Sequence, residues 1–132
     1  MYELVVKSRF AAAHFLRDYD GPCAQMHGHT WLVEAVFRGS ELDDKGMLVD
    51  FKILKNAVRE VIDRLDHQNL NDLEQFQEGR RQNPTAENLA RFIYCALIDN
   101  LSVVPQVSIV SVRVNESPEA GAVYYNCTKG VL

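Results

Sequence analysis

Three histidines and a cysteine occupy positions at which they could share chemistry. The stretch CAQMHGHTW, residues 23–31, contains Cys23, His27 and His29, although the whole chain holds only three cysteines and four histidines. Because His27 and His29 stand two residues apart in a segment with strand periodicity, both imidazoles point to the same side, about 6.6–6.8 Å apart along the chain. Two imidazoles on one side of a strand can share a cation.

His14, in the segment FAAAHF, supplies a third imidazole. Antiparallel pairing of the segments 1–14 and 27–38 would bring it beside the other two. Three neutral nitrogen ligands leave a fourth tetrahedral position open, which is the pattern of a catalytic zinc site, and imidazole also suits other divalent metals. Cys23 could instead complete the coordination and make the site structural, and the spacing favours neither arrangement. The alternative without a metal is a set of hydrogen-bonded histidines in the core or at its rim.

The remaining histidine follows an aspartate in the segment LDHQNLND. Asp66 and His67 could act together as an acid and a proton carrier, or they could only close a helix, whose C-terminal dipole favours histidine. Glu116 ends an apolar strand pattern. It could be a solvated rim residue, or it could hold a ligand that presents a paired N–H edge, since a carboxylate accepts two hydrogen bonds at once.

Hydrophobic periodicity predicts the elements that must position these side chains. A period of two indicates strands at 1–14, 27–38, 107–117 and 121–129. Apolar stripes with helical spacing indicate helices at 50–65 and 85–101. Asp50 and Thr85 are the expected N-caps, and Glu87 lies in a first turn, where its charge suits the helix dipole. The order ββααββ predicts an α+β fold, in which a four-stranded antiparallel sheet carries both helices on one face.

If these elements alternate in direction, the chemically notable residues gather at one end of the sheet. The end of the first strand, the loop after it, the start of the second strand, the end of the first helix and the end of the third strand would meet there. These segments carry His14, Cys23, His27, His29, Asp66, His67 and Glu116. We therefore expect one site at one end of the fold.

The bulk composition is that of one soluble globular domain spanning 1–132. With 47% hydrophobic and 24% charged residues the chain can bury a core, and no apolar run approaches the ~18 residues that cross a bilayer. We expect no signal peptide, no membrane contact and a cytoplasmic location. A net charge of −4 disfavours nucleic-acid binding. The odd cysteine count predicts thiols, with Cys95 and Cys127 buried and inert.

Six segments, taken in order, resemble the 6-pyruvoyl-tetrahydropterin synthase family, and most closely its bacterial branch of 6-carboxy-tetrahydropterin synthases. They span nearly the whole chain and read FAAAHF, CAQMHGH, GMLVDF, LDHQNLND, NPTAEN and VNES. The resemblance implies the tunnelling fold (T-fold), in which trimers join their sheets into a barrel and two trimers stack as a homohexamer. Barrel closure would also cover the two exposed edges of a four-stranded sheet.

The resemblance implies a role for each candidate residue. It makes His14, His27 and His29 the ligands of Zn²⁺ and Cys23 the catalytic base. Asp66 and His67 become a proton relay that can come from a neighbouring subunit. The resemblance also makes Glu116 the pterin anchor and Thr85 and Glu87 part of the pterin pocket. The implied substrate is 7,8-dihydroneopterin triphosphate. In the bacterial branch this lyase releases acetaldehyde and triphosphate and leaves 6-carboxytetrahydropterin, a step toward queuosine and other deazapurines.

Details of the sequence bear on the product and on the phosphates. Three residues separate Cys23 from His27, as in the bacterial branch, which favours the carboxy product. The alternatives are a 6-pyruvoyl product, another pterin side-chain lyase and, in another class, a catalytically silent module that binds zinc and pterin. This chain departs from the family pattern at Gln25, Phe15 and Ala86, where basic, arginine and hydroxyl side chains are common. The candidates that remain for the triphosphate are Arg17, Lys52 and Lys129.

Overall fold

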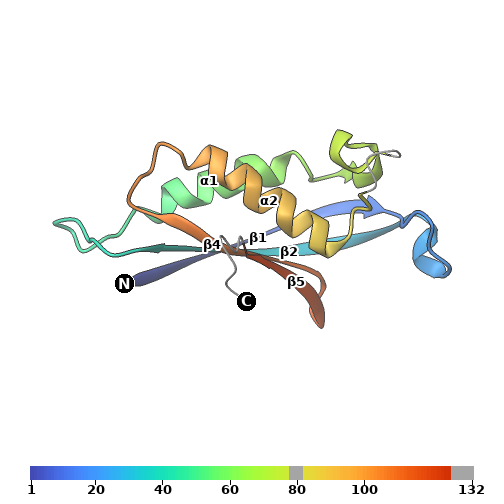
Figure 1. Cartoon of the computed structure of the whole chain (residues 1–132), viewed down its shortest axis with the longest axis horizontal. Helices are drawn as coiled ribbons and strands as arrows, with labels where there is room; N and C mark the ends of the chain where they lie inside the picture. Colours follow the sequence, from blue (N-terminus) through green and yellow to red (C-terminus); the bar gives the residue numbers. More distant parts are fainter. Residues whose placement is uncertain (78–81, 126–132) are drawn as a thin grey trace, which may run out of the picture.

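The computed structural model describes residues 1–77 and 82–125, and its one sheet carries both helices on a single face (Figure 1). The strands are β1 (Tyr2–His14), β2 (His27–Gly39), β3 (Gln68–Asn69), β4 (Ser108–Ser117) and β5 (Ala120–Tyr125). The helices are α1 (Phe51–Asp63) and α2 (Ala86–Asn100), with 3₁₀ turns at Pro22–Ala24, Leu70–Asp72 and Glu74–Phe76. The predicted α+β class and the order of the main elements are confirmed.

The sheet is mixed and has five strands in the order β3-β1-β2-β4-β5, so the prediction of four antiparallel strands was wrong in this respect. The additional strand, β3, pairs parallel to β1 at Ala12 and Ala13. It forms because the chain after α1 is tied to the free edge of β1. The Asp66 carboxylate accepts a hydrogen bond from the Ala11 N–H at 2.9 Å, and the His67 N–H donates to the Ala11 carbonyl at 2.6 Å.

β1 and β2 pair along their full length without a bulge. Their register runs from Tyr2 opposite Gly39 to His14 opposite His27. β4 pairs antiparallel with β2 on the other side, and β5 continues the sheet as a hairpin with β4. Because side chains alternate along a strand, this register places the inward residues at the end of β1 directly beside those at the start of β2.

The core lies between the inward face of the sheet and the two helices. Alternate side chains of β1, β2 and β4 point into it, and the buried stripes of α1 and α2 cover them. Trp31 is fully buried there, stacks on Phe10 with ring centroids 6.0 Å apart, and donates from Nε1 to the Ala12 carbonyl at 3.2 Å. A buried indole usually keeps its N–H bonded, and this bond ties Trp31 to the end of β1.

Both predicted N-caps are confirmed, but the predicted helix end is not. The Asp50 carboxylate accepts from the Lys52 N–H at 2.9 Å, and the Thr85 hydroxyl accepts from the Asn88 N–H at 3.1 Å. α1 ends at Asp63 rather than at residue 65. The following turn leads the chain away from the helix axis to the edge of β1.

The two remaining predictions concern thiols and the last strand. Cys95 is exposed, so the prediction of its burial was wrong, because the buried stripe of α2 runs along the other side of that helix. Cys127 and the predicted strand residues 126–129 lie outside the described residues. Within 1–77 and 82–125, neither helix has the length and apolar character that crossing a bilayer requires.

Candidate metal centre

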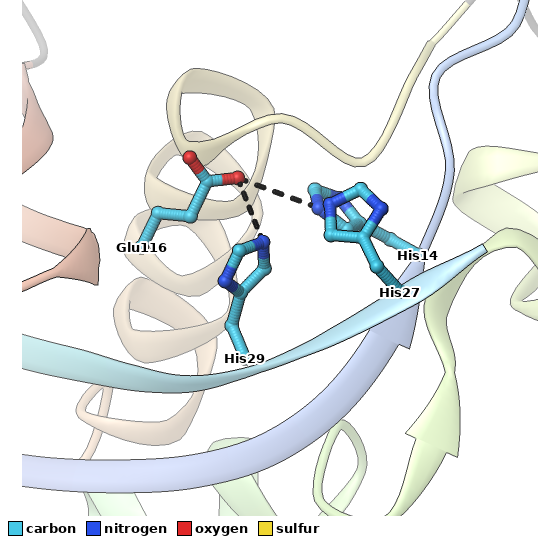
Figure 2. A group of neighbouring side chains, drawn as sticks. All are labelled: His14, His27, His29 and Glu116. Atoms are coloured by element: carbon cyan, nitrogen blue, oxygen red, sulfur yellow. Dashed lines mark ion pairs between the residues drawn. The ribbon is translucent and has the colours of Figure 1, made fainter. Parts of the chain in front are cut away.

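Three imidazoles gather where β1 ends and β2 begins (Figure 2). The ring centroids of His14 and His27 lie 4.5 Å apart, those of His27 and His29 4.8 Å, and those of His14 and His29 5.2 Å. Trp31 borders the cluster, edge-on to His14 at 4.9 Å and to His29 at 5.1 Å between centroids. The antiparallel register thus brings together the three histidines against an apolar ring.

The outer nitrogens of two imidazoles are held by backbone carbonyls. Nδ1 of His14 lies 2.7 Å from the carbonyl oxygen of Pro84, and Nδ1 of His27 lies 2.7 Å from that of Gln25. A carbonyl oxygen can only accept, so Nδ1 carries the proton in both rings and Nε2 keeps its lone pair. The same outer contact orients most metal-binding histidines in proteins.

A fourth side chain, Glu116, joins the three histidines. Its Oε1 lies 3.2 Å from Nε2 of His29 and 3.4 Å from Nε2 of His14 (Figure 2). A β-bulge between Asn115 and Ser117 makes Glu116 the additional residue of β4 at the hairpin. Among the described residues, the ligand atoms of these four side chains all lie within 4.8 Å of one another. Sequence reasoning placed Glu116 at the same end of the sheet as the histidines and gave it a ligand-binding role, but it did not count Glu116 among the possible metal ligands.

The donor set fits a divalent cation. Nε2 of His14 and Nε2 of His29 are buried and have no hydrogen-bond partner, although the Glu116 carboxylate lies within ion-pair distance of both. An unpaired buried polar atom costs about 1–3 kcal/mol, and a bound cation would remove that cost. Imidazole nitrogens with a carboxylate suit zinc and several other divalent metals. This cluster could therefore hold a metal ion.

Burial keeps two of the imidazoles in the form that binds metals. Burial is the largest cause of the lowered pKa of His14, and the hydrogen bond to Pro84 opposes it. The pKa of His29 is lowered by burial too, with the Glu116 carboxylate as the opposing influence. A metal binds neutral imidazole, so a lowered pKa reduces competition from protons.

Cys23 lies outside this group. It belongs to the 3₁₀ turn Pro22–Ala24 in the loop that joins β1 to β2, and its side chain is half-buried. Its carbonyl accepts a hydrogen bond from the Leu16 N–H at 2.9 Å. Of the described residues, the cluster of possible ligands contains Glu116 in addition to the three histidines, and it does not contain Cys23.

Asp66 and His67 also lie apart from the imidazole cluster, on the edge of β1. Nδ1 of His67 lies 3.0 Å from the Asp66 carboxylate, and the His67 side chain is 82% exposed. The pKa of Asp66 is lowered, chiefly by the hydrogen bond from the Ala11 N–H and then by the one from His67. His67 has a left-handed backbone with φ of 60°, an uncommon conformation outside glycine that is found often at functional sites.

His67 lines an open hollow beside the edge of β1. This hollow of about 600 Å³ is also lined by His29 and by the outward residues of β1 and β2, which include Ala11, Ala13 and Thr30. His14, His27 and His29 alternate with those residues and project to the helix side. Within one chain, Asp66 and His67 therefore lie outside the cluster formed by the three histidines and Glu116, although His29 borders the hollow that His67 lines.

The remaining candidates occupy different surroundings. Thr85 is used as the N-cap of α2, next to the Pro84 carbonyl that holds His14, and Glu87 is exposed in the first turn. Lys52 begins α1 beside Phe51, which lines a pocket together with Tyr2, at the end of the sheet remote from the histidines. Lys129 lies outside the described residues.

Arg17 has a structural role in this fold. Its guanidinium donates to the carbonyl of Phe76 and, at 3.3 Å, to that of Asn71, and it lies over the Phe15 ring at 5.5 Å from the centroid. These contacts use donors that a triphosphate would need. Sequence reasoning missed these contacts, because they join residues 59 and 54 positions apart.

We expect His29→Ala to weaken the binding of Zn²⁺ or Co²⁺ by more than the roughly 10- to 100-fold that loss of an outer partner costs, because one of three imidazoles is lost. Titration of the metal-free protein and metal content after dialysis measure this. Thr30→Ala, a neighbouring change on the other face of β2, is the matched control. Equal metal affinity in His29→Ala and the wild-type chain would exclude the cluster as a metal centre.

The metal-free protein should lose stability as the pH falls from about 7 to about 5. The folded-state pKa of His14 and of His29 lies below the usual 6.5, so the unfolded state binds protons first and the free energy of unfolding decreases once the pH drops below 6.5. Urea denaturation in a chelator at several pH values measures the slope. The double variant His14→Gln, His29→Gln should show a shallower slope, and an unchanged slope would show that these imidazoles do not cause it.

Comparison with known proteins agrees with this architecture. The family model described as 6-pyruvoyl tetrahydropterin synthase matches residues 3–127. The 6-carboxy-5,6,7,8-tetrahydropterin synthase of Bacillus subtilis is 41% identical over 128 residues, which cover 93% of this chain and 84% of the relative. The dihydroneopterin monophosphate aldolase of Pyrococcus furiosus is 35% identical over 98 residues, 74% of this chain and 76% of the relative.

A solved structure shows the same fold along almost the whole chain. The 6-pyruvoyl tetrahydropterin synthase of Caenorhabditis elegans superposes with a TM-score of 0.82 at 28% sequence identity, and the match covers 96% of each chain. The sequence comparison and the fold comparison thus agree on one family. The chain belongs to the 6-pyruvoyl tetrahydropterin synthase family.

Proposed function

We propose that this protein is a zinc-dependent 6-carboxy-5,6,7,8-tetrahydropterin synthase, a lyase that converts 7,8-dihydroneopterin triphosphate and water to 6-carboxytetrahydropterin, acetaldehyde and triphosphate. The observation that carries the proposal is the cluster of three imidazoles, two of them held at Nδ1 by backbone carbonyls, while the Cys23 thiol lies outside it. A cysteine that is not a ligand is free to act on substrate. The identity to the B. subtilis enzyme supports the carboxy product.

His14, His27 and His29 would hold Zn²⁺ through their Nε2 atoms. The bound ion would supply Lewis acidity toward the hydroxyl groups of the pterin side chain. The imidazoles are arranged for this role before any ion binds, because carbonyl oxygens fix two of the rings and burial keeps two of them neutral. Such preorganisation leaves a position for substrate oxygen beside three neutral ligands.

Proton transfers would belong to three other side chains. Sγ of Cys23 takes a proton from a side-chain carbon of the substrate, and Nε2 of His67 exchanges protons with a substrate oxygen. Asp66 holds Nδ1 of His67 at 3.0 Å and, because its pKa is lowered, stays ionised to stabilise the protonated ring. A carboxylate that orients an imidazole in this way also sets which nitrogen is free to react.

We place the Asp66–His67 pair in the site of a neighbouring subunit. The His67 side chain is 82% exposed, it stands outside the imidazole cluster of its own chain, and β1 with β3 forms an edge of the sheet. In a trimer of sheets that closes into a barrel, and in a hexamer of two trimers, such an edge meets another chain. The catalytic set would then be completed at an interface.

Glu116 would anchor the pterin by accepting hydrogen bonds from its amino group and ring N–H. Its half-buried carboxylate lies beside the imidazoles of His14 and His29. One ligand could therefore contact the carboxylate and the imidazole cluster together. Thr85 and Glu87, at the start of α2, would complete the pterin pocket. The cellular role that follows is a cytoplasmic step toward queuosine.

A second candidate activity is aldol cleavage of a phosphorylated dihydroneopterin. The similarity to the P. furiosus aldolase favours it, over a shorter stretch of the chain. A pyruvoyl product is a third outcome of the same chemistry. A catalytically silent zinc- and pterin-binding module would bind the substrate and release nothing.

Incubation of the zinc-loaded protein with 7,8-dihydroneopterin triphosphate separates these activities by their carbon fragments. We expect acetaldehyde, free triphosphate and a 6-carboxy pterin, identified by mass. Cys23→Ala should keep its metal and its assembly and lose turnover, because only the base is removed; Cys95→Ala is the matched control. A two-carbon aldehyde that carries phosphate would indicate the aldolase activity. Release of triphosphate without any carbon fragment would indicate the pyruvoyl product. Full turnover by Cys23→Ala would contradict the assigned role of Cys23.

Mixed oligomers should reveal sites shared between subunits. Cys23→Ala and His67→Ala proteins should each be inactive alone, whereas co-expressed or co-refolded mixtures should regain activity, because roughly a quarter of the interfaces in a random mixture combine both intact residues. Activity per site in the mixture is the measurement. A mixture that assembles but remains inactive would place Asp66 and His67 in the site of their own chain.

A further inference from the structure

Two asparagine side chains extend the edge of β1 beyond His14. Asn71 accepts from the Phe15 N–H at 2.9 Å and donates to the Phe15 carbonyl at 3.0 Å. Asn83 makes the same pair of bonds with Arg17, at 2.9 and 3.1 Å. A carboxamide presents one donor and one acceptor side by side, as a neighbouring strand does. Each asparagine thus replaces one residue of a strand partner.

The opposite edge of the same segment holds the loop that carries Cys23. Leu16, between the two clamped residues, donates its N–H to the Cys23 carbonyl at 2.9 Å. In an extended chain, alternate residues direct their backbone groups to opposite edges. The position of the Cys23 turn relative to β1 therefore depends on the conformation of residues 15 and 16, which follow β1 directly.

The clamp at Arg17 also bears on the imidazole cluster. Pro84 follows Asn83 directly, and its carbonyl is the group that holds Nδ1 of His14. The Asn83 carbonyl accepts from the Thr85 N–H at 2.8 Å and from the Asn88 side chain at 2.9 Å, which fixes the turn before α2. Asn83 thus sets the distance between that turn and the end of β1.

The two clamps are linked to each other. The Arg17 guanidinium donates to the Asn71 carbonyl at 3.3 Å, so the residue held by Asn83 reaches back to the residue that holds Phe15. The Asn71 side chain is buried, and its own N–H is bonded to the Asn69 side chain at 3.3 Å. Neither carboxamide can turn away without breaking several bonds at once.

We propose that Asn71 and Asn83 are positioning residues: Asn83 holds the His14 imidazole in its metal-binding orientation through Pro84, and Asn71 holds the Cys23 turn through residues 15 and 16. Neither asparagine touches metal or substrate. The part that concerns Cys23 rests on the proposed function, whereas the part that concerns His14 is a statement about metal binding alone. The two parts have separate measurements.

Asn83→Ala should weaken Zn²⁺ binding roughly 10- to 100-fold and alter the visible spectrum of the Co²⁺-loaded protein, as expected for loss of an outer partner of a ligand. Asn71→Ala should keep nearly normal metal affinity and KM and lower kcat by up to about 100-fold, the cost of displacing a catalytic group by about 1 Å. The metal result does not depend on the substrate. An inactive wild-type enzyme would refute the proposed function and leave the Asn83 test intact.

Asn100→Ala is the matched control, because the Asn100 carboxamide also bonds a backbone carbonyl, that of Ala57, at the far end of α2. It should lower stability with unchanged metal affinity, Co²⁺ spectrum and kcat. Wild-type metal affinity and spectrum in Asn83→Ala, or wild-type kcat in Asn71→Ala, would overturn the corresponding part. If either variant fails to fold, amide hydrogen exchange of the wild-type chain tests whether the two clamps hold residues 15 and 17. Phe15 and Arg17 should exchange as slowly as the interior of β1, and rapid exchange there would refute the clamps.

Discussion

The uninterrupted antiparallel register of β1 with β2 is the constraint on which the rest of the structure depends. Over 13 residues it places His14 opposite His27, with His29 two positions further along the same face. A slip by one residue would send every side chain of β1 to the other face of the sheet. The stacked pair Phe10 and Trp31 lies in this register next to the histidines. The same strand pairing therefore determines both the packing of the core and the geometry of the imidazole cluster.

The functional groups form two sets, one on the helix side of that sheet and one at its edge. On the helix side, buried neutral imidazoles and one carboxylate form a compact donor set beside Trp31. At the edge of β1, the Asp66–His67 pair is tied to the backbone of Ala11, and the His67 side chain is exposed. If other copies of the chain paired with the open edge of the sheet, the unpaired backbone groups of that edge would form hydrogen bonds. The same pairing would bring the imidazole cluster of one subunit close to the Asp66–His67 pair of another. Assembly and catalysis would then have the same structural cause.

Much of this could be predicted from the sequence, because the deciding signals are local. Strand alternation placed the imidazoles of His27 and His29 on one side, and the N-caps Asp50 and Thr85 follow from the type of one residue and its place before an apolar stripe. The resemblance in six short segments identified the family that the comparisons show.

The features that escaped prediction depend on contacts between distant residues. The two-residue strand β3 has too few residues for a period, and it exists because Asp66 and His67 bond to Ala11, some 55 positions away. Alternation placed Glu116 at the same end of the sheet as the histidines, but it did not reveal the bulge at this residue or its contact with His14 and His29. The clamp by Asn71 joins residues 56 positions apart, while its local sequence resembles an ordinary turn.

X-ray absorption of the Zn²⁺-loaded protein tests the central claim most directly, because it reports which atoms surround the ion. Zinc–nitrogen and zinc–oxygen distances are about 2.0–2.2 Å, whereas a zinc–sulfur distance is about 2.3 Å and scatters distinctly. Three imidazole nitrogens and a light fourth ligand, with no sulfur, are the predicted inner sphere. A sulfur scatterer in that sphere would make the Cys23 thiol a ligand and contradict its assignment as a free base.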